Sequence, residues 1–322
     1  MKTTTIFAVG TAVFCLLLLL LTHTPDAPTA ELPEETAAEP QMAEPELFDQ
    51  NTTLRVLHGQ EVREMPLDEY LTGVLFAEMP ADFGAEALKA QAVASRTFTL
   101  RQSEQRKHSD ADVCTDAACC QGWRDPSDSP DAAAFADAVR QTDGLVVTYG
   151  DALIDATYFS CSGGKTEAAA AVWGGEVPYL QSVESPDEGE SYNESRTWSA
   201  EEFAEVFTAA YPEAVLLGEP SAWFGAASYT RGGGIERICI GGVELKGTTL
   251  RALFGLRSTD IHISADAQSV TLSTAGFGHR VGMSQYGAAA MAENGSGFAE
   301  ILCHYYQSTE IKRLSRQATG QP

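Results

Sequence analysis

The sequence predicts an α+β protein whose folded part consists of two subdomains, preceded by one membrane-spanning helix at the N-terminus. Three observations support this prediction. An apolar stretch opens the chain, an acidic segment without an apolar pattern follows, and from residue 50 onward short strand-like and helix-like patterns are mixed. About 270 of the 322 residues lie beyond the N-terminal segments, enough for one large domain or two small ones, and we expect two packed subdomains.

The N-terminal segment is uncharged over residues 3–22, and its centre, residues 6–21, is almost wholly apolar. At 1.5 Å per residue it is nearly long enough to span ~30 Å of hydrocarbon. A cleaved signal peptide is the alternative, but a small-residue cleavage site after Leu21 is weak, and Phe14 before Cys15 fits a lipoprotein cleavage box poorly. We therefore expect residues 1–24 to be a short cytoplasmic end and a retained single anchor in the cell membrane, with the rest of the chain extracytoplasmic.

Residues 25–49 form an acidic segment in which no apolar pattern recurs. They contain eight carboxylates, five prolines and no Lys or Arg, so they cannot bury enough apolar surface to offset the entropy of folding. We predict an extended linker. The whole chain is also acidic, with 45 Asp and Glu against 21 Lys and Arg and a formal net charge of -24. This balance argues against a nucleic-acid partner, because such binding sites need clustered cations.

A strand at 54–58 and a helix at 67–78 are the first elements that we predict in the folded part, with a polar turn between them. The helix is bounded by Pro66 and Pro80, and its apolar positions recur at helical spacing: Leu67, Leu71, Val74 and Leu75. One face of this helix is therefore expected in the core. Glu78 then falls in its last turn.

The remaining elements follow from the same kinds of pattern. A second helix is expected from about residue 83 to 101, with Asp82 as a candidate N-cap, and residues 114–130 are polar and turn-rich. We further expect helices at 132–142, 199–211 and 285–293, strands at 145–149, 154–158 and 270–273, and a hairpin followed by a short helix at 232–256.

Several separate segments match one family pattern in the same order along the chain. They are Ala77-Glu-Met-Pro80, EALKAQAVASRTF at 86–98, YFSCSGGKT at 158–166, PYLQSV at 178–183, LFGLRS at 253–258 and GHRVGMSQYG at 278–287. Together they resemble the stage II sporulation protein D family. The resemblance implies a catalytic domain over residues 50–315, followed by a tail at 316–322.

The resemblance also implies an endolytic peptidoglycan lytic transglycosylase. Such an enzyme breaks the bond from N-acetylmuramic acid to N-acetylglucosamine and closes the muramic C6 hydroxyl onto C1. The family's catalytic glutamate falls on Glu78. One carboxyl suffices, because it protonates the leaving oxygen and then accepts the C6 hydroxyl proton. Glu78 must then be protonated near neutral pH, which needs burial beside apolar groups such as Phe76 or Met79. The alternative is a solvated glutamate at a helix end.

The family motifs imply further polar contacts in a groove between two subdomains, with Glu78 at its floor. Lys89, Gln91 and Arg96 are assigned to orienting Glu78 or to holding sugar hydroxyl and acetamido groups, although a solvated helix face is the alternative. The small-residue loop and the GHRVGMSQYG turn would contact a neutral sugar chain through these residues: Tyr158, Ser160, Ser162, Thr166, His279, Ser284 and Gln285.

Aromatic residues are expected to add a platform for the sugar, and the candidates are Tyr158, Tyr179 and Tyr286. The resemblance is incomplete in this region. The family has glycine after the histidine of the GH motif and commonly tryptophan before the last glycine, whereas Arg280 and Tyr286 stand here, and an arginine there could narrow the groove. The SGGKT run lacks the spacing of a phosphate loop, so we expect no nucleotide or other organic cofactor.

Cysteines cluster within a short, turn-rich segment, which suggests a metal more than a disulfide scaffold. By resemblance, the ligands of a structural zinc ion would be His108, Cys114, Cys119 and Cys120. A disulfide from Cys114 or free thiols are the alternatives. A catalytic zinc is not expected, because four protein ligands leave no open position. The scattered cysteines are expected to be small buried hydrophobes: Cys161, Cys239 and Cys303.

The expected partners follow from the resemblance alone. They are peptidoglycan glycan strands already stripped of stem peptides, a cell-wall amidase and a membrane partner of the engulfment machinery during sporulation. A second hypothesis is a non-enzymatic enhancer that binds and activates a cell-wall amidase. A zinc-dependent hydrolase is a third hypothesis, which the lack of a His-Glu-x-x-His pattern weakens.

Overall fold

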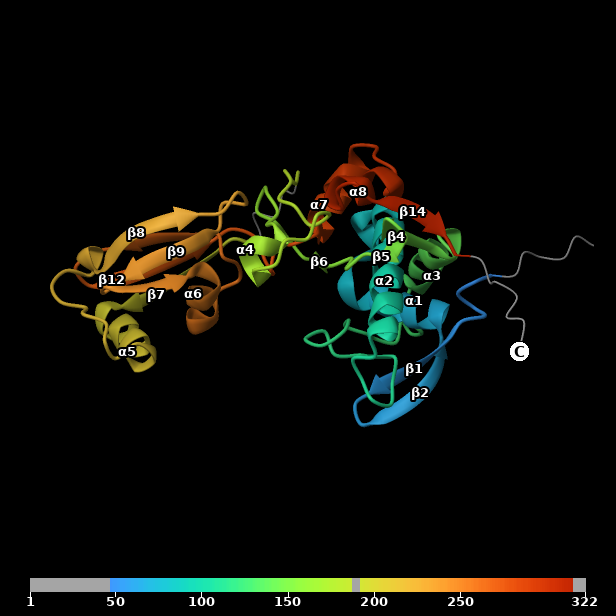
Figure 1. The fold of residues 1–322 in the computed structure, drawn as a ribbon, viewed down its shortest axis with the longest axis horizontal. Helices are drawn as coiled ribbons and strands as arrows, with labels where there is room; N and C mark the ends of the chain where they lie inside the picture. The colour runs from blue at the N-terminus through green and yellow to red at the C-terminus, as the bar shows by residue number, and fades with distance from the viewer. Residues whose placement is uncertain (1–46, 187–191, 315–322) are drawn as a thin grey trace, which may run out of the picture. The chain divides into compact units, whose positions relative to one another are not determined.

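The computed structural model describes residues 47–186 and 192–314 and has the mixed α+β architecture that the sequence predicts (Figure 1). The predicted membrane anchor at 1–24, most of the predicted linker and the tail at 316–322 lie outside the described residues. Among the helices of the described ranges, none is both long and apolar enough to cross a bilayer.

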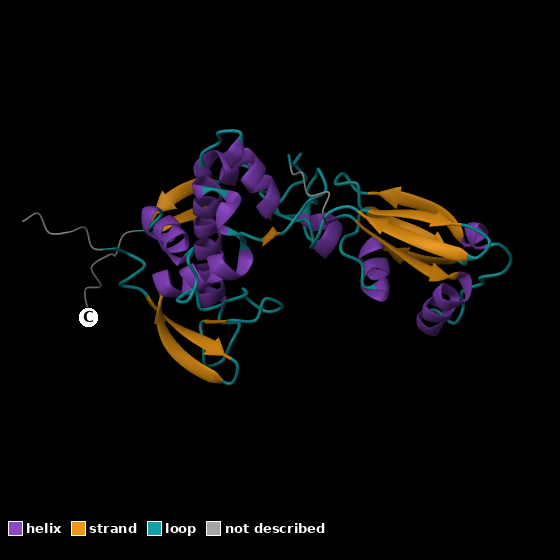
Figure 2. Ribbon diagram, turned by 180° about the vertical axis from the view of Figure 1, so that it is seen from behind, coloured by secondary structure: helices purple, strands orange, loops and turns teal. Residues whose placement is uncertain are grey.

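The first hydrophobic core is built around α2 (Ala85–Gln105), which is buried along most of its length. Ala87, Ala90, Ala92 and Ala94 have no exposed surface, and such small side chains let neighbouring helices pack closely. Figure 2 shows the helices gathered around α2. Those in contact with it are α1 (Leu67–Glu78), α3 (Ala132–Gln141), α7 (Gln285–Glu293) and α8 (Phe298–Tyr305).

Short strands complete this first core in three small sheets. One has the order β2-β1-β3, another the order β14-β4-β5, and the third is the parallel pair β13-β6. The bounds of these strands are β1 (Thr53–His58), β2 (Glu61–Pro66), β3 (Val113–Cys114), β4 (Leu145–Tyr149), β5 (Ala152–Leu153), β6 (Tyr158–Phe159), β13 (Met283–Ser284) and β14 (Glu310–Arg313). Two short helical elements belong with them, η1 (Ala81–Phe83) and α4 (Ala169–Trp173).

A second hydrophobic core lies in two antiparallel three-stranded sheets. The strand orders are β10-β9-β8 and β11-β12-β7. The elements are β7 (Glu194–Ser199), α5 (Ala200–Ala210), η3 (Pro220–Trp223), β8 (Phe224–Tyr229), β9 (Ile235–Ile240), β10 (Val243–Lys246), α6 (Gly247–Phe254), β11 (Ile261–Ala265) and β12 (Ser269–Thr274). The helix α5 begins at a capping box between Ser199 and Glu202 and buries Phe203 and Phe207.

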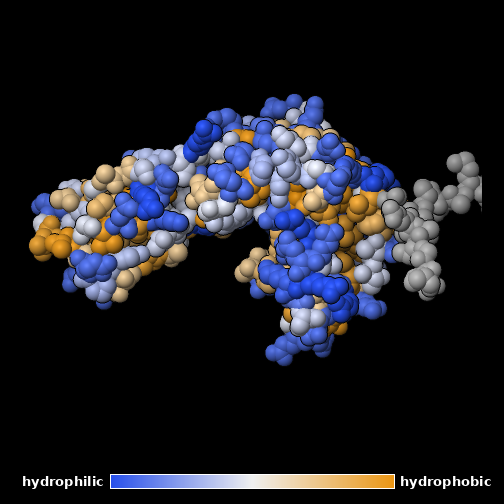
Figure 3. All heavy atoms as spheres, viewed as in Figure 1, coloured by the Kyte–Doolittle hydropathy of each residue, from blue (hydrophilic) through white to orange (hydrophobic). Residues whose placement is uncertain are grey.

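Most predicted helices lie where they were expected, because the spacing of apolar residues that predicts a helix is contained within the helix itself. One predicted strand and one predicted turn are wrong. Residues 154–157 are not a strand but connect β5 to β6, and the expected polar turn after β1 contains the strand β2. Four of the six β2 residues are exposed, and hydrophilic residues cover much of the β1–β2 ribbon in Figure 3, so no buried alternation marks this strand in the sequence.

The predicted linker extends too far toward the C-terminus. Asp49, its last residue, is 1% exposed, and its carboxylate accepts hydrogen bonds from the Arg96 guanidinium. The backbone amides of Phe48 and Asp49 both donate to the Asp143 carboxylate. The fold therefore already includes these residues, because the acidic side chain has a buried cationic partner that its local composition does not reveal.

Candidate active site

Glu78 is the last residue of α1, and its position follows from how that helix ends. Met79 has an extended backbone (φ -132°, ψ 141°), and Pro80 follows it. The buried face of α1 anchors the helix through these residues: Leu67, Tyr70, Leu71, Val74 and Leu75. Glu78 is therefore held on a packed helix at a point where the chain turns away.

The Glu78 side chain borders two hollows. One, about 300 Å³, is also lined by Tyr158, Ser160, Phe277 and His279. The other, about 500 Å³, is also lined by Phe76, Arg124 and Phe135 and by two further carboxylates, Asp82 and Asp131. Among the described residues that line the smaller cavity, Glu78 is the only carboxylate.

Burial raises the pKa of the Glu78 carboxyl above its ordinary value, because desolvation penalises the charged form. Two hydrogen bonds lower that pKa and so limit the rise. The Gln285 amide donates from Nε2 to Oε2 of Glu78 at 3.2 Å, and the backbone N–H of Gly122 donates to the same carboxyl. Within the described ranges, no cation contributes to this shift. The group is thus suited to carry a proton and to release it.

A buried polar network lies beside Glu78. The Tyr158 hydroxyl donates to Oε1 of Gln121 at 2.9 Å, and the Gln121 amide donates to Oγ1 of Thr99 at 2.7 Å. Burial raises the pKa of Tyr158, and the neighbouring Glu78 carboxylate adds to the rise, so this phenol stays neutral. Gln121 and Gly122 were missed in the sequence, because they lie in a polar segment whose turn-like composition gives no sign of which residues face the site.

The structure gathers several of the predicted sugar-contacting residues around one cavity. Tyr158, Ser160 and His279 line it with Glu78, and Gln285 contacts the Glu78 carboxyl. Burial and the nearby Arg251 lower the pKa of His279 to about 4, so its imidazole is neutral at neutral pH. Ser284 is buried and caps α7, accepting a hydrogen bond from the Gly287 amide at 3.1 Å. It therefore supports the start of the helix that carries Gln285 rather than the cavity surface.

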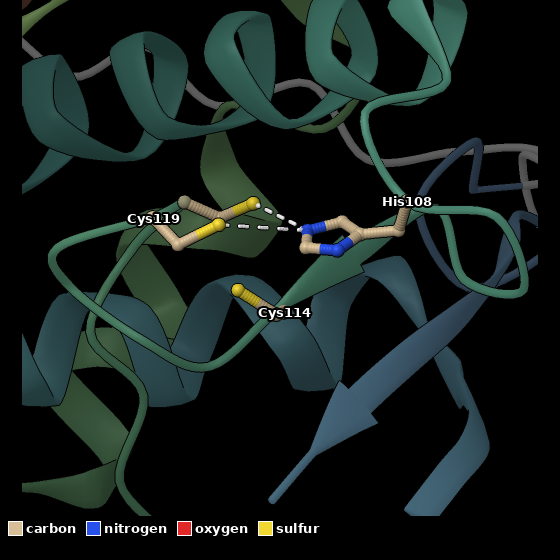
Figure 4. Close-up of side chains that lie close together, drawn as sticks. His108, Cys114 and Cys119 are labelled. Carbon is tan, nitrogen blue, oxygen red and sulfur yellow. Dashed lines mark hydrogen bonds between the residues drawn. The ribbon is translucent and has the colours of Figure 1, made fainter. Parts of the chain in front are cut away.

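The side chains of His108, Cys114, Cys119 and Cys120 point toward one another, as Figure 4 shows for the three that it labels. Their candidate ligand atoms all lie within 4.8 Å of one another. Nε2 of His108 is 3.3 Å from Sγ of Cys120 and 3.8 Å from Sγ of Cys119. A tetrahedral zinc ion with Zn–S of about 2.3 Å and Zn–N of about 2.0 Å places its ligand atoms roughly 3.5 to 3.8 Å apart, so the set fits zinc after small adjustments.

This His-Cys cluster adjoins the candidate catalytic residue. Cys120 is buried and also lines the smaller cavity, and it is followed directly by Gln121 and Gly122, which contact Tyr158 and Glu78. The described cysteines form no disulfide with one another. Of the scattered cysteines, Cys161 is buried as predicted, whereas Cys239 is half-buried and Cys303 is exposed; for these two the prediction is wrong.

Comparisons with known proteins find relatives that match most of this chain. The chain is 37% identical to Stage II sporulation protein D of Bacillus amyloliquefaciens over 295 residues, covering 86% of this chain and 83% of that protein. The chain belongs to the stage II sporulation protein D family. The same identity, 37%, holds over 267 residues of Stage II sporulation protein D of Bacillus subtilis (strain 168), covering 79% of this chain and 76% of that protein.

A family model described as Stage II sporulation protein matches residues 58–149, a range that contains both Glu78 and the His-Cys cluster. A more distant relative is the Amidase enhancer of Bacillus subtilis (strain 168). It is 28% identical over 307 residues, which cover 75% of this chain and 40% of that protein. The predicted membership of the stage II sporulation protein D family is thus confirmed.

In this member of the stage II sporulation protein D family, Arg96 does not line the cavity. Its side chain is fully buried, and its guanidinium donates to the Asp49 carboxylate and to the carbonyls of Leu145 and Val139. Gln91 is also fully buried and donates to Ser95. The prediction that these two side chains hold a sugar is therefore corrected, because neither has an exposed atom.

Other predicted contacts also have structural partners instead. Lys89 forms an ion pair with Glu86 at 2.7 Å. Thr166 is fully buried, and its hydroxyl accepts a hydrogen bond from the Val183 amide at 2.9 Å. Ser162 has no exposed surface either, so Ser162 and Thr166 cannot touch a bound glycan and the prediction is wrong for both.

Arg280, the departure from the stage II sporulation protein D pattern, does not narrow the cavity, contrary to expectation. It is fully buried, and its guanidinium donates to the carbonyls of Ser162 and Gly232 at 2.7 Å each. Acidic groups of Glu167 and Asp260 lie 3.6 and 3.3 Å away. Its backbone has φ of +65°, the left-handed region that favours the glycine of the family pattern. The ion pairs with Glu167 and Asp260 stabilise Arg280 in a backbone conformation that is unusual for a residue other than glycine.

Proposed function

We propose that this chain is an endolytic lytic transglycosylase that cleaves peptidoglycan glycan strands between N-acetylmuramic acid and N-acetylglucosamine, leaving a 1,6-anhydro end. The observation that carries the proposal is Glu78, a carboxyl with a raised pKa that borders a cavity lined otherwise by neutral groups. A single carboxyl of this kind can serve as both acid and base, whereas a hydrolase also needs a second carboxylate for water or for a covalent intermediate.

The proposed reaction uses the Glu78 carboxyl twice, first as an acid and then as a base. Glu78 donates its proton to the glycosidic oxygen while the bond from C1 of the muramic ring to that oxygen breaks. The C6 hydroxyl of the same ring then forms a bond to C1 and gives its proton to the Glu78 carboxylate. Atoms balance without water, and the carboxyl ends in its starting state.

Gln285 and Gly122 suit both halves of this cycle. Their N–H groups stabilise the carboxylate that forms after the first proton transfer. Because both donors are neutral, they lower the pKa of Glu78 less than an adjacent cation would, so burial still keeps this pKa above that of an exposed glutamate. A lysine or arginine in the place of Gln285 would favour the ionised form and work against the first step.

We also propose that the His-Cys cluster holds a structural zinc ion. The four ligands His108, Cys114, Cys119 and Cys120 would complete a tetrahedral set, and such an ion supplies a cross-link rather than an open coordination position. The cross-link would tie the segment after α2 together and hold Gln121 and Gly122 against the Glu78 site.

The setting is part of the same proposal. The catalytic domain would act outside the cytoplasm, tethered to the cell membrane through the apolar residues 3–22 and a flexible acidic linker. Its substrate would be glycan already stripped of stem peptides by a cell-wall amidase during engulfment in sporulation, with a membrane partner of the engulfment machinery. Kinship with proteins named Stage II sporulation protein D supports the sporulation setting.

The second candidate function is a non-enzymatic enhancer of a cell-wall amidase. It is favoured by the likeness to the Amidase enhancer of Bacillus subtilis (strain 168). An enhancer acts through a binding surface and has no physical need for a carboxyl with a raised pKa inside a cavity. The two functions therefore differ in their dependence on the Glu78 proton.

The deciding experiment incubates the purified protein with stem-free glycan strands and analyses the products by mass spectrometry. Glu78→Gln keeps the shape of the side chain but cannot carry the proton, and Glu69→Gln on the exposed face of the same helix is the matched control. The proposal expects 1,6-anhydro ends, lighter by one water than hydrolysis products, from the parent and from Glu69→Gln only. Reducing ends would instead identify a hydrolase, and uncut strands with a faster added amidase would identify an enhancer.

A further inference from the structure

One half-exposed aromatic side chain lines the Glu78 cavity and a second contacts the cavity wall, and neither was predicted as part of the site. Phe277 lines the cavity and is 43% exposed, and Trp173, at the end of α4, is 49% exposed. The Trp173 ring is centred 5.3 Å from that of His279, which is itself part of the cavity wall. Exposed apolar rings beside a cavity that also carries a few polar groups mark a surface suited to a ligand with apolar faces.

Neighbouring groups hold both rings in place, through ring contacts for Phe277 and through the end of α4 for Trp173. Phe277 stacks on Tyr192 with ring centroids 6.0 Å apart, and the Arg257 guanidinium lies 5.7 Å from its centroid. Tyr192 in turn bonds the Tyr286 hydroxyl at 2.8 Å. The Trp173 position is set by the end of α4, where Gly174 adopts a left-handed conformation. Such preorganised rings bind a flat ligand face with little further loss of side-chain freedom.

Apart from Glu78, the polar groups that line this cavity are neutral. His279 has a pKa lowered to about 4, the Tyr158 phenol has a raised pKa, and Ser160 offers a hydroxyl. Nδ1 of His279 accepts a hydrogen bond from the Val281 N–H at 3.1 Å, and a backbone hydrogen bond with Tyr158 also holds the ring, so the imidazole forms a fixed, neutral part of the cavity wall. The lining therefore matches an uncharged pyranose ring with an acetamido group better than it matches the lactyl carboxylate of a muramic ring.

We propose that Phe277, His279 and Trp173 form the subsite for the N-acetylglucosamine ring on the leaving side of the cleaved bond. The faces of the sugar ring pack against Phe277 and Trp173, one of its hydroxyls bonds Ser160, and its O4 faces Glu78, which lines the same cavity as Phe277 and Ser160. This assignment rests on the proposed function for its direction along the strand. It adds the residues that select the ring and hold it.

The test measures binding separately from cleavage. In the full chain carrying Glu78→Gln, binding of the β-1,4-linked tetramer of N-acetylglucosamine is followed by calorimetry for Phe277→Ala, Trp173→Ala and Trp173→Phe. Tyr229→Ala is the matched control, because this tyrosine is 62% exposed on β8 and does not line the cavity. Circular dichroism checks that each variant is folded.

The alanine variants are expected to bind the tetramer about 2- to 12-fold more weakly, since an aromatic contact contributes about 0.5–1.5 kcal/mol and 1.4 kcal/mol is tenfold. Trp173→Phe keeps a ring and should stay within about threefold of the parent, while the ligand-induced change in tryptophan fluorescence is largely lost. Tyr229→Ala should bind as the parent does. Equal affinity in all variants, or no tetramer binding by the parent, overturns the subsite.

Cleavage by the proteins with native Glu78 separates this inference from the proposed reaction. Phe277→Ala and Trp173→Ala are expected to raise KM for glycan strands. If strands are never cut while the binding differences hold, the reaction is refuted and the subsite stands. If 1,6-anhydro products form with unchanged KM in both variants, the subsite is refuted and the reaction stands.

Discussion

Arg96 offers the sharpest test of the structure against the family-based expectation, because the two assign it different tasks. The side chains of Arg96 and Asp49 are 0% and 2% exposed, and the guanidinium uses Nε and both terminal nitrogens in hydrogen bonds. Arg96→Met removes the cation and leaves the Asp49 carboxylate buried without its partner. Breaking a buried pair from one side costs about 3–5 kcal/mol, so we expect a loss of stability of that size.

The matched control is Arg140→Met on α3, which breaks a surface ion pair with Asp137 whose side chains are 60% and 56% exposed. An exposed pair contributes about 0–1 kcal/mol. For a domain of this size 1 kcal/mol corresponds to roughly 2–4 °C in Tm, so Arg96→Met should melt about 6–20 °C lower and Arg140→Met at most about 4 °C lower.

Thermal melting followed by circular dichroism measures this difference in Tm. Cleavage kinetics at a temperature where every variant is folded measure whether Arg96 contributes to substrate binding. If Arg96 is structural, the folded Arg96→Met protein keeps the KM of the parent for glycan strands. The double variant with Asp49→Asn should lose less than the sum of the two single losses, because the orphaned charge is also removed. Arg96→Met that melts like the parent but has a raised KM would refute the structural assignment.

Three further predictions concern the pKa of Glu78, the His-Cys cluster and the packing beneath the site. The acid form of Glu78 starts the proposed reaction, so the rate should fall as pH rises through the raised pKa of this carboxyl. Gln285→Ala removes a hydrogen bond that lowers this pKa, so the alkaline limb of the kcat profile should move to higher pH. An unmoved limb in the pH–rate profile would contradict that role. Elemental analysis should find about one zinc per chain, and Cys114→Ser should lose most of it with a lower Tm, because one of four ligands is gone; full zinc content in this variant would exclude the assigned set. Gly73→Ala should lower the free energy of unfolding by about 1–3 kcal/mol in urea, since its new Cβ would lie 2.1 Å from Nε1 of Trp123, and an unchanged midpoint would show that the indole moves freely.

The family membership and the outline of the first core could be read from the sequence because both depend on local spacing. Pro66, Pro80 and four apolar residues define α1 over one short stretch, and the structure has the helix at Leu67–Glu78. The cysteines at 114, 119 and 120 lie close in sequence, so a short loop can bring them together with His108. Patterns of this range are encoded by neighbouring residues.

The family motifs did not reveal which of their polar side chains are buried. Arg96, Gln91, Thr166 and Ser162 all belong to family motifs, and a polar residue in a motif can serve a ligand or the fold. In the structure each is fully buried, so they serve the fold. Arg280 is the clearest case, because its partners Glu167 and Asp260 stand far away in the chain and nothing local marks them as a set.

The sequence by itself determined the secondary structure around Glu78, the family and the candidate ligands of a metal. Only the tertiary structure decided which groups meet the Glu78 carboxyl. Gln285 is separated from it by 207 positions, and Gly122 and Phe277 reach the same site from other parts of the chain. The pKa of a carboxyl depends on how much water and which dipoles surround it, and these are set by chain segments that become neighbours only when the core packs.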